Sequence, residues 1–267
     1  MQAVDSAQMV VAIDGPSGSG KSTVARGVAA RLGFGYLDTG AMYRAVTWLV
    51  LDAGLPLGDL SEQTERLHAL LEGAALELST DPADRHVRIA GHDVTEVIRG
   101  PEVTGAVSAV AATPAVRAHL SGLQRTLAMA AVARSGGIVV EGRDIGTAIF
   151  PDAGLKIWLT ASPEARGRRR AAEHSDGAPV EASAVDGTVE QLARRDTLDS
   201  TRKHSPLQRA EDAHVIDTTP LSAEQVVDAV LALWGTVELP DDAADRPARG
   251  NHPHADDLQD SATGASR

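Results

Sequence analysis

The residues with the clearest chemistry lie near the N-terminus, in the segment GPSGSGKST. Its spacing, GxxxxGK[ST], follows a short β-branched run and precedes a helix-forming segment, which is the context of a phosphate-binding P-loop. The glycines let backbone N–H groups turn toward a polyphosphate, and the helix that begins near Lys21 adds the partial positive charge of its N-terminus. The Lys21 ammonium can reach the β- and γ-phosphates, and the Ser22 hydroxyl can coordinate Mg²⁺. The residues expected to hold the triphosphate are Gly15, Pro16, Ser17, Gly18, Ser19, Gly20, Lys21, Ser22 and Thr23.

Four further clusters combine arginines with hydroxyl or carboxylate side chains near the ends of expected strands. Phosphoryl transfer needs such distributed cationic donors, because charge develops on the transferred group in a site that excludes water. No general base is required, since an attacking phosphate oxygen is already ionised near neutral pH. The clusters are Thr39 with Tyr43 and Arg44; Ser108 with Arg117, Glu141, Arg143 and Asp144; Arg166 with Arg170; and Arg195 with Asp199 and Arg202. Isolated arginines such as Arg31, Arg85 and Arg168 are expected to be solvated surface charges.

The elements that must position these clusters form an α/β pattern. Short apolar runs alternate with helical segments, which predicts a parallel sheet flanked by helices. Ligands of such sheets bind beyond the carboxyl ends of the strands, where each candidate cluster falls. Strands are expected at residues 9–14, 36–38, 138–141, 155–159 and 214–217.

Two segments depart from this alternation. Residues 75–79 and 86–90 read as a hairpin around the turn DPAD, which indicates a small β subdomain inserted after a helix over residues 61–71 that begins with a serine N-cap. Residues 175–186 are rich in Gly, Pro, Ser, Asp and Ala, which predicts a mobile loop, with a helix resuming at Thr188.

Composition excludes several classes of protein. The 267 residues carry a formal net charge of −12, and only 3% are aromatic, which argues against nucleic-acid binding. The chain has no cysteine, no basic and apolar leader, and no apolar run long enough to span a bilayer, so a soluble cytoplasmic protein is expected, without a membrane partner. Residues 236–267 are acidic and poor in large apolar side chains, which predicts a disordered tail.

Six segments, in this order, resemble the bacterial cytidylate kinase family: GPSGSGKST, LDTGAMYRA, VSAVAATPAVR, VVEGRDIGTAIFPDA, RRDTLDSTRKHSPL and VIDTT. The resemblance covers residues 9–235, and EGRDIGT with RDxxDxxRxxSPL makes it far more specific than the P-loop alone. It implies the nucleoside monophosphate kinase fold, with a parallel five-stranded sheet, an enlarged monophosphate-binding region over about 55–113 and a helical lid over about 161–205. The inserted hairpin matches that enlargement.

The resemblance also implies roles for individual residues. The residues implied to act in catalysis are Lys21, Arg143, Arg202 and Arg170. Those implied to grip the acceptor phosphate are Tyr43, Arg44, Arg143 and Arg202, and those implied near the ribose are Thr39, Arg195 and Asp199. The implied cytosine readers are Ser108, Arg117 and Asp144. By analogy with related kinases, Arg166 and Arg170 contact ATP as the lid closes. Glu141 stands where some members of the family have aspartate.

These observations lead us to expect an ATP- and Mg²⁺-dependent kinase that phosphorylates CMP and dCMP, most simply as a monomer. A carboxylate such as Asp144 can accept from the amino group of cytosine but faces a carbonyl in uracil, which favours cytosine over a kinase of the same fold for UMP, AMP or shikimate. A P-loop switch that changes partners is the alternative from another class. A guanine-specific switch normally needs an NKxD loop, and the sole asparagine here is Asn251, in the tail.

Overall fold

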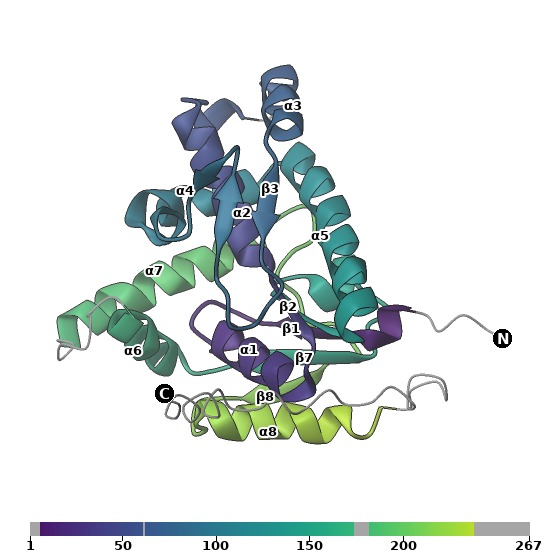
Figure 1. Cartoon of the computed structure of the whole chain (residues 1–267). Helices are drawn as coiled ribbons and strands as arrows, with labels where there is room; N and C mark the ends of the chain where they lie inside the picture. Colours follow the sequence, from purple (N-terminus) through teal and green to yellow (C-terminus); the bar gives the residue numbers. More distant parts are fainter. Residues whose placement is uncertain (1–5, 61, 174–181, 238–267) are drawn as a thin grey trace, which may run out of the picture.

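A central parallel sheet carries the candidate residues at one edge. The computed structural model describes residues 6–60, 62–173 and 182–237, and the sheet has the strand order β2-β6-β1-β7-β8 (Figure 1). All five expected strands are confirmed within one or two residues at each end. Their bounds are β1 (Val10–Asp14), β2 (Gly35–Asp38), β6 (Ile138–Gly142), β7 (Leu155–Thr160) and β8 (His214–Asp217).

The central strand is β1, which lies between β6 and β7. Its residues are buried throughout, as are those of β6, which explains why both strands read as continuous apolar runs. The register sets Ile13 opposite Glu141 of β6 and Ile157 of β7. The P-loop after β1 and the EGRD segment of β6 therefore leave the sheet side by side.

Helices cover the sheet and form a second layer above it. Helices α1 (Lys21–Leu32) and α8 (Ala223–Trp234) pack against each other, with α8 along the bottom of Figure 1, and α5 (Pro114–Ser135) packs against β2 and β6. Helix α2 (Thr39–Asp52) leads away from the sheet and packs against α4 (Pro101–Ala112). None of the described helices is long and apolar enough to cross a membrane.

The expected inserted hairpin is confirmed, and it has a third strand. Strands β3 (Leu76–Leu78), β4 (Val87–Ile89) and β5 (His92–Asp93) form an antiparallel sheet, in which the very short β5 had no sequence signal. The preceding helix α3 (Thr64–Gly73) begins later than expected, and the serine predicted as its N-cap lies outside the described residues.

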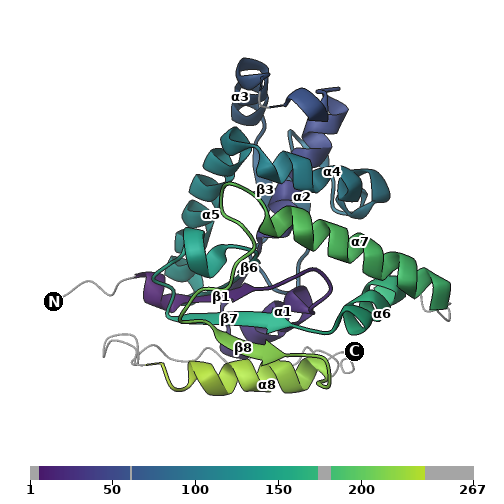
Figure 2. The same cartoon turned by 180° about the vertical axis from the view of Figure 1, so that it is seen from behind.

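Two helices extend from the other side of the sheet. Helices α6 (Pro163–Glu173) and α7 (Ala182–Ser200) pack against each other and project to the left in Figure 1 and to the right in Figure 2. The expected loop over 175–186 is partly wrong, because α7 already begins at Ala182; most of the rest of that loop lies outside the described residues. Val185 and Val189 pack against the backbone of Gly167 in α6, and this tertiary contact overrides the loop-like local composition.

Candidate active site

The P-loop has the backbone geometry that a phosphate cradle requires. Gly15 and Gly18 adopt φ values of 149° and 75°, in the region that favours glycine. A Cβ at Gly15 would lie 2.1 Å from the carbonyl oxygen of Leu159, so no larger residue fits there without a backbone shift. The loop leads directly into α1, whose first residue is Lys21, so the N-terminus of this helix points its unpaired N–H groups at the same place.

Lys21 lies among several cations. Its Nζ donates to the Pro16 carbonyl at 2.8 Å, which folds the side chain back over the loop. Burial, and after it the proximity of Arg143, hold the pKa of this ammonium well below its ordinary value of 10.5. Burial likewise lowers the pKa of Arg195 to about 9, with further lowering by Arg143, and the Arg195 Nε has no hydrogen-bond partner among the described residues. An anionic ligand would relieve this crowding of positive charge.

Two carboxylates at the ends of β2 and β6, those of Asp38 and Glu141, lie near the start of α1. Glu141 accepts hydrogen bonds from the Tyr36 hydroxyl and, at 2.9 Å, from the Ser22 hydroxyl. Burial raises the pKa of the Glu141 carboxyl, and the nearby charge of Asp38 raises it further. Asp38 also caps α2, because its carboxylate accepts from the Ala41 N–H at 2.9 Å. A hydroxyl and two carboxylates thus meet beside the P-loop.

One cavity collects most of the residues expected to bind the acceptor. It extends from Lys21 between α2, α4 and α7. Of the residues expected to bind the acceptor, its lining includes Thr39, Tyr43, Ser108, Arg117, Arg143, Asp144, Arg195, Asp199 and Arg202. Arg44 does not line it; its Nη1 donates to the Ile98 carbonyl at 2.9 Å and to the Thr104 hydroxyl at 2.8 Å, which ties it to the neighbouring segment.

A buried ion pair forms part of the lining of this cavity. Arg117 of α5 donates to the Asp144 carboxylate, and the two side chains are only 7% and 6% exposed. The Arg117 guanidinium lies 5.5 Å from the centre of the Tyr43 ring, so the pair and the ring form one polar and aromatic wall. The Tyr43 hydroxyl has no hydrogen-bond partner among the described residues, and burial raises its pKa. Polar groups that are buried this deeply are suited to discriminate the hydrogen-bond pattern of a flat ring.

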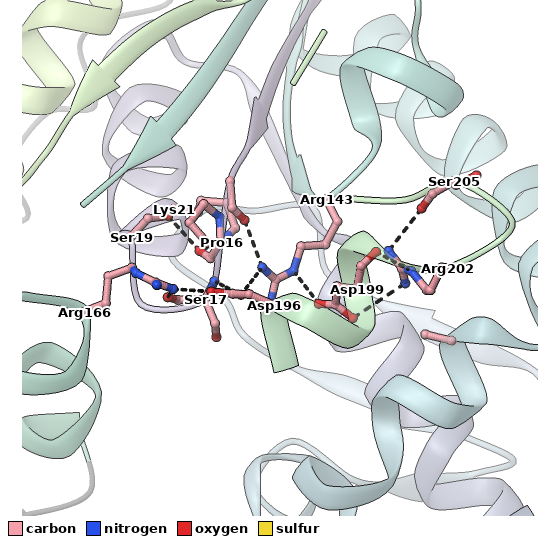
Figure 3. Close-up of polar contacts among 12 residues, drawn as sticks. Pro16, Ser17, Ser19, Lys21, Arg143, Arg166, Asp196, Asp199, Arg202 and Ser205 are labelled. Carbon is pink, nitrogen blue, oxygen red and sulfur yellow. Dashed lines mark hydrogen bonds and ion pairs between the residues drawn. The ribbon is translucent and has the colours of Figure 1, made fainter. Parts of the chain in front are cut away.

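A network of arginines and aspartates connects the P-loop with α7 (Figure 3). Arg143 donates to the Gly15 carbonyl at 3.1 Å and pairs with Asp199 at 3.3 Å. Arg202 donates to the backbone oxygens of Asp199 at 3.2 Å and Ser205 at 3.1 Å, and it also pairs with the Asp199 carboxylate that contacts Arg143. On the other side of the loop, Arg166 of α6 donates to the Ser17 carbonyl at 3.1 Å. Cations from two parts of the chain therefore converge on the P-loop.

A second cavity lies between the P-loop and the inserted sheet. Lys21 and Asp38 line both cavities, so the two meet at these residues. Arg170 lines the second cavity, and its guanidinium also pairs with Glu173 at 2.5 Å. Arg85, which the sequence analysis treats as a surface charge, is exposed, but it lines this cavity as well. Arg31 and Arg168 are exposed, as expected.

Two acidic side chains of the site are not among the residues that the sequence predicts to act there. The sequence predicts Asp38 only as the end of a strand, although it lines both cavities. Asp196, within RRDTLDSTRKHSPL, has no predicted role, although its carboxylate contacts Arg143, Arg166 and the P-loop. Asp196 follows Arg195 directly and lies one helical turn before Asp199, and this spacing was the signal that could have identified it.

Comparisons with known proteins agree with this geometry. Residues 11–236 match the family model described as cytidylate kinase. A cytidylate kinase from Streptomyces griseus is 49% identical over 84% of this chain and 92% of its own length, and one from Streptomyces avermitilis is 48% identical over the same shares. A bifunctional pantoate ligase/cytidylate kinase from Prochlorococcus marinus is 47% identical over 91% of this chain and 48% of its own. A solved shikimate kinase from Acinetobacter baumannii is 17% identical over 86% of this chain and 95% of that one, with a TM-score of 0.36, a likeness that carries no conclusion. With its P-loop, its EGRD segment and its match over most of its length, this chain belongs to the cytidylate kinase family.

Proposed function

We propose that this protein transfers the γ-phosphoryl group of ATP to CMP and dCMP, which gives CDP or dCDP and ADP. The observation that carries the proposal is the buried Arg117–Asp144 pair in the lining of a cavity that the P-loop lysine also lines. The membership of the cytidylate kinase family and the names of its close relatives support the same activity.

The base-binding role of this wall follows from hydrogen-bond chemistry. The amino group of cytosine donates, and Asp144 accepts; the ring carbonyl and nitrogen of cytosine accept, and the guanidinium of Arg117 donates. Uracil would place a carbonyl against the Asp144 carboxylate, so two hydrogen-bond acceptors would face each other in a buried site, which costs binding energy. Ser108 of the same cavity adds a hydroxyl that can adapt to either partner.

The transfer step needs no protein base. An oxygen of the CMP phosphate attacks the γ-phosphorus of ATP, a new P–O–P bond forms, and the bond to the β,γ-bridging oxygen breaks so that its electron pair leaves with ADP. Lys21 binds the β- and γ-phosphates, while Arg143 and Arg202 bind the acceptor phosphate and stabilise the charge of the transferred group. Tyr43 assists at the acceptor phosphate, and the residues assigned to its ribose are Thr39, Arg195 and Asp199.

A magnesium ion fits the oxygen donors beside the P-loop. The Ser22 hydroxyl and the carboxylates of Glu141 and Asp38 are hard ligands of the kind that Mg²⁺ prefers, and they lie where the phosphates of a bound triphosphate would end. When bound with ATP, Mg²⁺ supplies neutralisation of the charge on the β- and γ-phosphates. Ser22 holds the ion directly in this proposal, and Glu141 orients the Ser22 hydroxyl.

Helices α6 and α7 form the proposed lid, and Arg166 and Arg170 of α6 contact ATP when it closes. Closure would exclude water, which would otherwise accept the phosphoryl group. The segment from α3 to α4, including the inserted sheet, forms the proposed monophosphate-binding region. We further propose a monomer that acts in the cytoplasm; light scattering of the purified protein, with and without substrates, tests the first point.

The proposal is tested by measuring ADP release from ATP and Mg²⁺ with CMP, dCMP, UMP, AMP, GMP or shikimate as acceptor, each at the same concentration. Turnover confined to CMP and dCMP is expected. Comparable turnover with UMP, AMP or shikimate would contradict the assignment of Asp144 and Arg117 to the base. Tight ATP binding without turnover of any acceptor would instead favour a nucleotide-dependent switch.

A further inference from the structure

The carboxylate of Asp196 occupies a position that no other acidic side chain of the described residues shares. It lies on α7 above the P-loop, where Figure 3 shows it between Arg143 and Arg166. Its Oδ1 lies 3.5 Å from the Arg143 Nη1 and accepts the Ser17 N–H at 3.3 Å, while its Oδ2 accepts from the Arg166 Nη1. Both carboxylate oxygens are therefore engaged, each with a different arginine.

The two arginines come from opposite sides of the proposed reaction. Arg143 follows β6 and lines the cavity of the acceptor, whereas Arg166 belongs to the lid helix α6 and contacts the P-loop. Asp199, one turn later on α7, contacts Arg143 and Arg202, which both line the acceptor cavity. Among the described residues, only Asp196 pairs with an arginine from each side.

Each guanidinium contacts both Asp196 and the P-loop, and that of Arg143 also pairs with Asp199. Arg143 donates to the Gly15 carbonyl and Arg166 to the Ser17 carbonyl, so each arginine is anchored both to the P-loop and to Asp196. The Asp196 side chain is 16% exposed and those of Arg143 and Arg166 are 15% and 11% exposed, so water screens these charges only partly. Without the Asp196 carboxylate, Arg166 would lose its carboxylate partner, and Arg143 would be held by Asp199 and the P-loop but no longer linked to Arg166.

We propose that Asp196 is a positioning residue for phosphoryl transfer, which holds the acceptor-side Arg143 and the lid Arg166 at a fixed separation across the mouth of the P-loop. The inference rests on the proposed function, since it assigns the two arginines to the two substrates. A positioning role means that Asp196 acts on the alignment of both substrates in the ternary complex more than on the binding of either substrate alone.

The test compares Asp196→Asn with the wild-type protein. The substitution keeps the size of the side chain and one carbonyl oxygen but removes the charge that pairs with both arginines. We expect kcat to fall about 10- to 100-fold, the scale of a small misplacement of reacting groups, while the dissociation constants of ATP alone and of CMP alone change by less than about threefold. The matched control is Glu190→Gln, an exposed charge on the same helix, which leaves all three quantities unchanged.

Other outcomes contradict the inference. An unchanged kcat in Asp196→Asn overturns it. If ATP also binds more tightly to that variant, the carboxylate competes with the phosphates of ATP for the arginines. If Asp196→Asn unfolds, Asp196→Glu carries the test, because it keeps the charge but moves it by one methylene; an unchanged kcat there also overturns the inference. Wild-type turnover of CMP is measured in the same series, so a failure of the proposed function shows in the wild type and a failure of this inference only in the variants.

Discussion

Replacement of Asp144 by Asn tests the base assignment most directly. The carboxylate is almost fully buried and is paired with Arg117. For CMP, the variant loses a charged hydrogen bond to the amino group, about 1.5–3 kcal/mol. For UMP, it removes the unfavourable contact between two acceptors, the uracil carbonyl and the buried carboxylate, about 1–3 kcal/mol. The two changes add in the ratio of kcat/KM for CMP over UMP, which we expect to fall by about 2.5–6 kcal/mol, or roughly 70- to 25,000-fold.

The assay is ADP release at a fixed, saturating concentration of MgATP, with CMP or UMP varied. Because Asp144→Asn leaves the Arg117 guanidinium buried without its counter-charge, it also lowers the free energy of unfolding by about 3–5 kcal/mol. The double variant Arg117→Gln with Asp144→Asn removes both charges, so it should recover much of this stability without recovering the preference for CMP. Asp152→Asn, an exposed aspartate of the same segment, is the control for both measurements. Equal losses of kcat/KM on CMP and UMP, with the ratio unchanged, would refute the reasoning.

Three further predictions concern charged groups around the P-loop. Lys21→Ala should lower kcat by at least about 100-fold without loss of the fold. Lys203→Ala, which changes an exposed lysine, is the control and should leave kcat unchanged. Near-normal turnover of Lys21→Ala would show that the loop binds phosphate without serving catalysis. Burial raises the pKa of Asp14 to about 6 from 3.8, so the folded protein binds this proton more tightly than the unfolded chain, and stability falls as pH rises from about 4 to 6. The difference in unfolding free energy between Asp14→Asn and the wild type should therefore shift in favour of the variant by up to about 3 kcal/mol from pH 4 to pH 7, as measured by urea unfolding. The exposed Asp52→Asn is the control, and its unfolding free energy should run parallel to that of the wild type over this pH range. The same parallel course for Asp14→Asn would contradict the prediction. Chelation of Mg²⁺ should abolish turnover, and Glu141→Gln should raise the Mg²⁺ concentration needed for half-maximal rate; an unchanged requirement would remove Glu141 from the metal site.

The centre of the sheet could be predicted because β1 and β6 are buried throughout and bounded by turn formers. Residues 10–13 and 138–140 are short apolar runs of the kind that a parallel sheet buries on both faces. What failed were elements that depend on distant partners. The start of α7 depends on packing of its valines against Gly167, and β5 is two residues long and exists through its pairing with β4.

The residues of the site that belong to recognised motifs could be predicted from the sequence. The spacing of the P-loop and the resemblance of EGRDIGT identified residues that the structure brings to one cavity, including Arg143 and Asp144. Arg44 shows the limit of this approach. Whether its guanidinium binds a ligand or the Ile98 carbonyl depends on the direction in which the side chain points, which the spacing of a motif does not specify. Asp196 shows the same limit in the other direction: it belongs to the motif RDxxDxxRxxSPL, but the spacing does not specify that its carboxylate pairs with Arg143 and Arg166.

The order of the strands in the sheet differs from their order in the chain, with consequences for folding. Strands β1 and β2 are synthesised first, but they are not neighbours, because β6 lies between them. Neither has a partner in the central sheet until more than a hundred residues later in the chain, when β6 supplies hydrogen bonds to both. Long-range pairing of this kind makes folding slow and leaves unpaired strand edges exposed in the meantime. A nascent chain that ends before Ile138 holds the complete P-loop sequence but cannot form the sheet that supports it, so the phosphate site is acquired only when the second half of the protein emerges.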